Sequence, residues 1–381
     1  MPGAPTGGGG SGSEEATDPV AALRRIAFLL ERTLESSYRV KAFRTAAAAL
    51  AALPPEDVVL LASTGGLRDI KGIGDRTAAV VEQSVAGEEP EYLATLEASS
   101  GGPLSGGPLS GGAVSGAGQE LRAALRGDLH LHSDWSDGGS PIDEMARTAA
   151  ELGHEYAALT DHSPRLTVAN GLTPARLRRQ LEVVREVGAA LAPFRLLTGI
   201  EVDVLSDGGL DQEPDLLGAL DVVVASVHSE LRMPADAMTR RMLTAVENPH
   251  TDVLGHCTGR YVVDREFLRG RSGQTRSGKA RPESQFDAER VFAACAERGV
   301  AVEINSRPER LDPPLRLLRM AVEAGCLFAI DTDAHAPGQL DWQPLGCARA
   351  VECGVPADRV VNTWPLDDLL AWTRDHSHRP A

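Results

Sequence analysis

From residue 119 onward, short apolar runs alternate with stretches in which apolar residues recur every three or four positions. Stretches of the second kind, such as the one that contains Ile142, Met145, Ala149 and Leu152, predict amphipathic helices. Apolar runs that alternate with such helices predict a parallel sheet. The predicted strands are about 126–131, 156–160, 195–203, 221–227, 253–256, 300–305 and 327–332. The predicted helices begin near Pro141 and Pro174 and then cover about 235–247, 286–298, 314–324 and 345–353.

Residues 18–97 have the helical pattern without strand-like runs and predict a small all-α domain. Its first helix has Leu23, Ile26, Leu30 and Leu34 at helical spacing, and YRVKAFRTAAAALAAL begins the second. In LRDIKGIGDRTAAVVEQ, two helical pieces are joined by two glycines, which allow a tight turn. Backbone N–H groups at the start of the next helix can then approach a DNA phosphate. This pattern predicts a helix-hairpin-helix motif, with an ordinary turn between helices as the alternative.

Two segments are too poor in apolar residues to offset their chain entropy. Residues 1–17 are therefore expected to form a disordered tail. Residues 98–118, ASSGGPLSGGPLSGGAVSGAG, predict a flexible linker, whose root-mean-square span is roughly 25 Å. The expected domains are residues 18–97 and 119–381.

Composition narrows the class of protein. A hydrophobic content of 42% favours a globular chain. No apolar run approaches the roughly 20 residues that cross a bilayer, and no signal peptide is evident, so we expect a soluble cytoplasmic protein without membrane partners. The net charge of −16 means that DNA would have to bind to local basic patches. The five cysteines lack metal-site spacing and are expected to be reduced thiols.

Possible metal ligands end six of the seven predicted strands. His130 and His132 are two positions apart and point to the same side of a strand, with Asp137 just beyond them. Carboxyl ends of parallel strands meet at one face of a barrel, so the ligands of all six strands are expected to converge there. Mixed imidazole and carboxylate ligands suit zinc, manganese or iron. The full set is His130, His132, Asp137, His162, Glu201, His228, His256, Asp333 and His335.

The motifs GDLHLHSDWSDG, ALTDHSP, GIEVDVLSDGGLD, VVASVHSE, LGHCTGR and DTDAH resemble the ordered motifs of the PHP (polymerase and histidinol phosphatase) family. They are most similar to the PHP module of bacterial family-X DNA polymerases, over about residues 126–364. The resemblance implies a distorted seven-stranded (β/α)7 TIM-like barrel of the α/β class. The N-terminal unit, in turn, resembles the helix-hairpin-helix DNA-binding domain of the same polymerases.

The resemblance also implies a cluster of three divalent ions. One ion would be held by His130, His132, Glu201 and Asp333, a second by Glu201, His228 and His256, and a third by Asp137, His162 and His335. A water that bridges two such ions is ionised near neutral pH and can attack phosphorus. The residues expected to take part in catalysis are Glu201, Asp333, His335 and Arg260.

Two arginines are candidates for binding a phosphate bidentately. Arg260 follows the fifth predicted strand, and Arg307 follows the sixth in INSRPER. An ion pair with a carboxylate at the barrel rim explains Arg260 equally well.

The sequence departs from the polymerases in two ways. The linker stands where their palm and fingers would be, so we do not expect a DNA polymerase. Val80 stands where members that cleave abasic sugars have a Schiff-base lysine, which makes lyase chemistry doubtful.

The preferred hypothesis is a metal-dependent phosphoesterase, a phosphatase or 3′–5′ exonuclease, that acts on DNA 3′ ends or abasic sites in DNA repair. The alternatives are a small-molecule phosphatase of the histidinol-phosphatase type and a non-catalytic DNA-binding protein with a structural metal cluster. The sequence leaves the oligomeric state open. The candidate DNA-binding residues are Arg39, Lys41, Arg44, Lys71, Gly72, Gly74 and Arg76, and, in the basic loop 269–282, Arg271, Arg276 and Lys279. That loop could equally be solvated and disordered.

Overall fold

The computed structural model describes residues 18–100, 116–262 and 280–375. The expected tail, most of the expected linker, and Arg271, Arg276 and Lys279 lie outside the described residues. The chain divides into two compact units, one of Met1–Leu30 with Glu35–Ser100 and one of Glu31–Leu34 with Gly101–Ala381. We describe each unit by itself.

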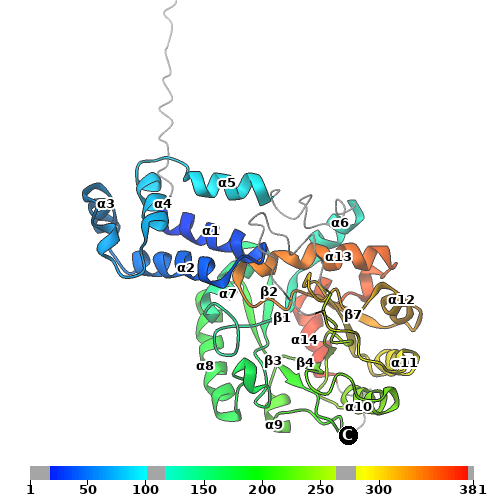
Figure 1. Ribbon diagram of the computed structural model, residues 1–381. Helices are drawn as coiled ribbons and strands as arrows, with labels where there is room; N and C mark the ends of the chain where they lie inside the picture. The colour runs from blue at the N-terminus through cyan, green and yellow to red at the C-terminus, as the bar shows by residue number, and fades with distance from the viewer. Residues whose placement is uncertain (1–17, 101–115, 263–279, 376–381) are drawn as a thin grey trace, which may run out of the picture. The chain divides into compact units, whose positions relative to one another are not determined.

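The second unit contains a seven-stranded parallel sheet in sequence order (Figure 1). A parallel bridge from Leu131 to Ala334 brings its first and last strands together. Side chains complete this seam, since Leu129 N donates to Asp331 Oδ1 at 2.8 Å and the Thr332 hydroxyl donates to Asp128. The sheet is thus a nearly closed barrel, which confirms the predicted fold class. The strands are β1 (Gly127–Leu131), β2 (Tyr156–Leu159), β3 (Arg195–Asp203), β4 (Val222–Ser226), β5 (Val253–Leu254), β6 (Ala301–Asn305) and β7 (Leu327–Asp331).

Helices cover the outside of the barrel (Figure 1). The helical stripe predicted from Met145 and Ala149 is buried against the sheet, as amphipathic spacing requires. The α-helices are α6 (Gly116–Ala124), α7 (Ile142–Glu151), α8 (Pro174–Ala190), α9 (Pro214–Leu217), α10 (Ala235–Glu247), α11 (Ala288–Arg298), α12 (Leu315–Glu323), α13 (Gln343–Glu352) and α14 (Leu366–Arg374). The short 3₁₀ helices are η2 (Thr167–Ala169), η3 (Pro337–Trp342), η4 (Ala357–Arg359) and η5 (Val361–Thr363).

Helix α9 is a single turn of four residues.

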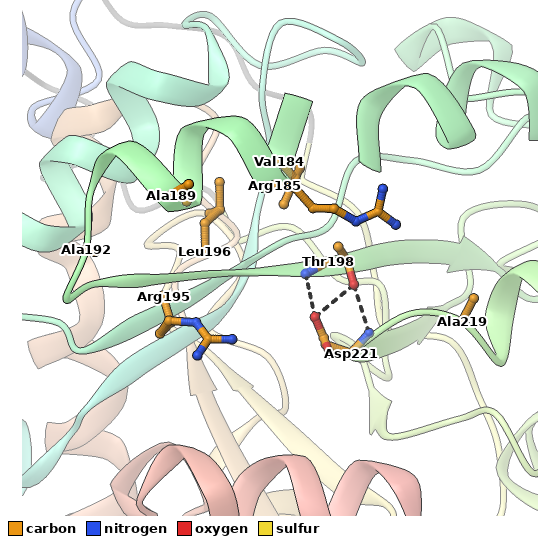
Figure 2. Close-up of a pocket in the computed structure, with 10 residues that line it drawn as sticks. Val184, Arg185, Ala189, Ala192, Arg195, Leu196, Thr198, Ala219 and Asp221 are labelled. Atoms are coloured by element: carbon orange, nitrogen blue, oxygen red, sulfur yellow. Dashed lines mark hydrogen bonds between the residues drawn. The ribbon is translucent and has the colours of Figure 1, made fainter. Parts of the chain in front are cut away.

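A groove of about 440 Å³ lies between α8 and the amino ends of β3 and β4 (Figure 2). Its wall includes Arg195, which begins β3, and Asp221, which precedes β4 and accepts hydrogen bonds from the Thr198 amide and hydroxyl. The groove is therefore at the opposite end of these strands from the predicted metal ligands.

The described residues of the first unit form helices and turns without a strand, as predicted. Its apolar core includes Leu23, Ile26, Phe43 and Val80, so the position of the Schiff-base lysine is buried. Helix α1 ends at Arg32, and Leu34, predicted to continue its stripe, lies beyond it with a φ of 53°. The elements are α1 (Pro19–Arg32), α2 (Ser37–Ala51), α3 (Pro55–Thr64), η1 (Gly66–Asp69), α4 (Asp75–Val85) and α5 (Glu91–Ser100).

Gly72 makes the hairpin turn between η1 and α4 possible. Its φ of +99° lies in the region that side chains disfavour. A Cβ atom at Gly72 would lie 2.6 Å from Thr45 Cγ2 on α2. The hairpin therefore rests directly against α2, on the face that also carries Lys41 one turn earlier.

Among the described residues, no single helix is long and apolar enough to cross a bilayer; the bent pair α2 and α3, at 118°, passes that test together. Helix α2 buries Phe43, Ala46, Ala47 and Leu50 in the domain core. All five cysteines are buried free thiols.

Candidate metal centre

The structure brings all nine predicted ligands together at the carboxyl ends of the strands. His130 lies inside β1, His132 directly follows that strand, and Glu201 lies near the end of β3. The side chains of these three residues are inaccessible to solvent. The others follow the ends of β1, β2, β4, β5 and β7: Asp137, His162, His228, His256, Asp333 and His335.

Glu201 is the centre of the cluster. Its Oε1 lies 2.8 Å from His256 Nε2 and 3.2 Å from His228 Nε2. Its Oε2 lies 2.8 Å from His162 Nδ1 and 3.4 Å from His130 Nε2. Burial alone would raise the pKa of Glu201, but the charges of the surrounding histidines outweigh it and hold that pKa well below its ordinary value. With His132 Nε2 at 3.6 Å from Oε2, one buried carboxylate therefore faces five imidazoles and stays ionised.

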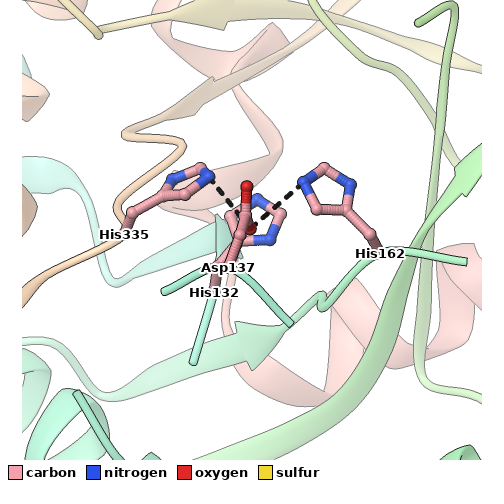
Figure 3. A group of neighbouring side chains, drawn as sticks. All are labelled: His132, Asp137, His162 and His335. Carbon is pink, nitrogen blue, oxygen red and sulfur yellow. Dashed lines mark ion pairs between the residues drawn. The ribbon is translucent and has the colours of Figure 1, made fainter. Parts of the chain in front are cut away.

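A second group surrounds Asp137 (Figure 3). Its Oδ1 lies 3.4 Å from His162 Nε2 and 3.4 Å from His335 Nε2, with His132 beside them. His132 Nε2 also lies 3.5 Å from Asp333 Oδ1, which joins this group to the rest of the cluster. Burial, with the charges of His335 and His162, holds the pKa of His132 well below its ordinary value. The imidazole of His132 is therefore neutral, the form that binds a metal.

The donor atoms form three groups, each of which could hold one ion. Within these groups, donor separations of 3.2 to 3.5 Å are close to the roughly 3.3–3.4 Å edge of a tetrahedron with metal bonds of about 2.0–2.1 Å, and the 2.8 Å between His162 and Glu201 is shorter. Eight buried donor atoms, including both ring nitrogens of His132 and His228, have no hydrogen-bond partner among the described residues. Buried polar atoms need partners, and divalent ions would supply them. The groups are His132, Asp137, His162 and His335; His130, His132 and Asp333; and His162, Glu201 and His228.

Sequence reasoning missed Glu303, a fully buried carboxylate on β6. Its Oε1 lies 2.6 Å from His130 Nδ1, and its Oε2 accepts the backbone N–H of His256 at 2.6 Å. The bond to Nδ1 turns Nε2 of His130 toward Glu201, so Glu303 orients a ligand without facing the donor groups itself. A single carboxylate inside the apolar strand AVEIN is the signal that could have found it.

Replacing Glu303 with glutamine is expected to weaken metal binding about 10- to 100-fold. The amide carries no charge to stabilise the correct tautomer of His130. Competition with a chelator measures the affinity directly. Glu155→Gln, which removes an exposed carboxylate paired with Arg126, is the matched control and should change nothing. Equal affinities in the two variants would contradict the role of Glu303.

The two candidate arginines lie in different places. Arg307 reaches the cluster, with Nη1 3.1 Å from the Asp333 carbonyl oxygen and 3.6 Å from Asp333 Oδ1. Arg260 instead donates to the backbone carbonyls of Arg310 and Leu311, and its Nη1 lies 3.5 Å from Glu283. The Arg260 guanidinium therefore holds the loop after β6 and lies near a carboxylate, an arrangement similar to the ion-pair alternative.

The candidate DNA-binding residues of the first unit differ in exposure. Lys41, Lys71 and Arg76 are exposed, and Arg76 lies over the Tyr92 ring at 5.1 Å. Arg39 is held by Glu35 at 2.7 Å and by the Tyr92 hydroxyl. Arg44 is partly buried, and Gly72 and Gly74 form the exposed hairpin.

The fold and the site define a TIM-like barrel with a histidine- and carboxylate-rich metal centre. Residues 128–307 match the PHP domain, and residues 15–89 match a helix-hairpin-helix domain. The two matches lie in the predicted order along the chain and confirm both resemblances.

Relatives with different names match this chain over about two thirds of its length. It is 37% identical to the DNA polymerase/3′-5′ exonuclease PolX of Bacillus subtilis (strain 168) over 66% of its length, and it spans 41% of that relative. It is 27% identical to a probable phosphatase of Thermoanaerobacter sp. (strain X514), over 62% of this chain and 89% of the relative. The crystal structure of a Lactococcus lactis histidinol phosphate phosphatase, complexed with zinc, L-histidinol and phosphate, is 18% identical with a TM-score of 0.42, over 60% of this chain and 94% of that one.

Proposed function

We propose that this protein is a metal-dependent phosphoesterase that acts on DNA 3′ ends or abasic sites. The observation that carries the proposal is the convergence of eight imidazole and carboxylate side chains around a ninth, buried Glu201. The PHP domain and the relatives named as exonuclease and phosphatase support hydrolysis of phosphate esters.

Different residues would have different roles in such a reaction. Zinc, manganese or iron ions held by the three groups would supply Lewis-acid chemistry and activate water for attack on phosphorus. Glu201 contributes a negative charge shared by neighbouring groups, and Asp137 and Asp333 contribute one each. Arg307, whose side chain is 16% exposed, places a positive charge at the edge of the cluster, where a phosphate would enter.

The helix-hairpin-helix domain supports DNA as the partner. At the start of α4, the Gly74 amide is satisfied by Thr77 Oγ1 at 2.9 Å. In the part of the chain that the structure describes, the next two amides, of Asp75 and Arg76, have no protein acceptor. Free amides at a helix start bind phosphate, and exposed Lys71 adds charge beside them.

A small-molecule phosphatase is the second candidate, because the chain spans most of the phosphatase from Thermoanaerobacter. A structural metal cluster is less well supported, since a scaffold does not require a carboxylate shared between sites.

A substrate panel tests the proposal. Manganese-loaded protein is incubated with 3′-phosphorylated, 3′-hydroxyl and abasic DNA and with histidinol phosphate, and elemental analysis counts the ions. We expect about three ions per chain and hydrolysis of at least one DNA substrate in preference to histidinol phosphate. Preference for histidinol phosphate would favour the second candidate. An intact, metal-loaded protein that hydrolyses none of them would refute the proposed activity.

A further inference from the structure

The loop after β6 carries an arginine that the sequence motifs do not single out. Arg310 is held in place through its backbone, because Arg260 Nε donates to its carbonyl oxygen at 3.0 Å. The next residue, Leu311, has a φ of 46°, a conformation rare for a branched side chain. Asp312 anchors the end of the loop by accepting the Thr258 hydroxyl at 2.6 Å. The loop thus has one fixed shape at the edge of the metal centre.

The guanidinium of Arg310 lies against the metal centre itself. Its Nε donates to Oδ2 of Asp333 at 2.7 Å, and the side chain is only 7% exposed. Nη1 of Arg310 is buried and has no hydrogen-bond partner among the described residues. Leaving a buried charged donor unpaired is costly, so this nitrogen is built for a partner.

Two other arginines, Arg241 and Arg307, do not present a free donor in this way. Arg241 uses Nε on the Leu205 carbonyl at 2.8 Å and Nη1 on the Ser229 carbonyl at 2.9 Å. Arg307 has an unpaired Nε, but that nitrogen lies 3.5 Å from the carboxylate of Glu309. Arg310 therefore differs in presenting a free donor beside Asp333, a predicted ligand.

Tyr261 fixes the orientation of that donor. The Arg310 guanidinium lies over the Tyr261 ring at 4.8 Å, and Arg281 lies over the same ring at 4.4 Å. The backbones of Tyr261 and Arg281 exchange hydrogen bonds at 2.9 and 3.0 Å. A ring held by its own backbone and by two cations has little freedom, so it limits the guanidinium in turn.

We propose that Nη1 of Arg310 binds the phosphoryl group of the substrate, and that Tyr261 is the residue that positions it. This inference rests on the proposed function, because it names the group that recognises the phosphate which that function requires. A planar guanidinium can bind Asp333 with one nitrogen and a phosphate oxygen with another. Recognition of phosphate would then depend on Arg310, which also holds the carboxylate of Asp333 in place.

Calorimetry with inorganic phosphate as the probe tests the inference without turnover. Metal-loaded protein is titrated, and the metal content of each variant is measured. Arg310→Gln should bind phosphate on the order of 10- to 100-fold more weakly. Arg310→Lys keeps the charge near Asp333 but loses the fork, and should bind about tenfold more weakly with full metal content. Tyr261→Ala should weaken binding, while Tyr261→Phe, which keeps the ring, should not.

Arg241→Lys is the matched control, since its carbonyl acceptors can take an ammonium group, and it should bind phosphate like the parent. Unchanged phosphate affinity in both Arg310 variants would overturn the inference. So would loss of the metal from both, which would leave Arg310 only a support for Asp333, or failure of the metal-loaded parent to bind phosphate. Weaker binding in the variants, together with a parent that hydrolyses no ester, would refute the proposed activity and leave the assignment of Arg310 standing.

Discussion

Glutamine in place of Glu201 is expected to be the most damaging single change in this protein. Both carboxylate oxygens face imidazoles, two at Oε1 within 3.2 Å and others at Oε2. The amide removes a negative charge that several donor groups share. The positive charge of the ions that these groups would hold is then not compensated. Removing one partner of such a buried set costs about 3–5 kcal/mol. A loss of that size in the stabilisation of the transition state would lower kcat/KM for a phosphate ester roughly 10²- to 10³-fold or more.

Steady-state kinetics and elemental analysis check this expectation together. The comparison variant is His256→Ala, which removes a single imidazole from the same carboxylate. It should retain more activity and more metal than Glu201→Gln. The reverse order, or full metal content in Glu201→Gln, would contradict the central role of this carboxylate.

The second large effect is expected in DNA affinity. Lys41, Lys71 and Arg76 are exposed, and Thr45 on α2 touches the hairpin at Gly72. Each phosphate that a cation neutralises adds about 0.7–0.9 to the slope of log affinity against log salt. Changing all three residues to glutamine should flatten that slope by up to about 2–3 units and weaken binding roughly 100-fold near 0.1 M salt.

Fluorescence anisotropy with duplex and single-stranded DNA across a salt series measures the slope. A control with the same change of charge replaces exposed Arg179, Arg185 and Arg240 on the outer helices of the barrel by glutamine. That control should keep the slope of the parent. If both variants lose affinity equally, binding depends on total charge, and the hairpin is not the contact surface.

Much of the fold follows from local pattern. The seven apolar runs predict seven strands whose observed ends differ by two residues at most, because burial on both faces of a parallel strand leaves a continuous apolar signal. The short strand β5, Val253–Leu254, ends two residues before the end of its predicted range, 253–256. Helix α9 has only one turn, too short for a periodic pattern to reveal.

The sequence by itself determined the barrel class and the convergence of the ligands, because parallel strands must end at one face and each ligand directly ends or follows a strand. Only the tertiary structure decided which atoms meet. Glu303 is 173 residues from His130, and Arg310 reaches Asp333 across 23 residues, so neither pairing leaves a local pattern. The same holds for Arg260, whose position at the catalytic face suits a phosphate clamp. Its guanidinium donates to the carbonyls of Arg310 and Leu311 in a neighbouring loop, and backbone acceptors that come close only in the folded chain leave no signal in the sequence.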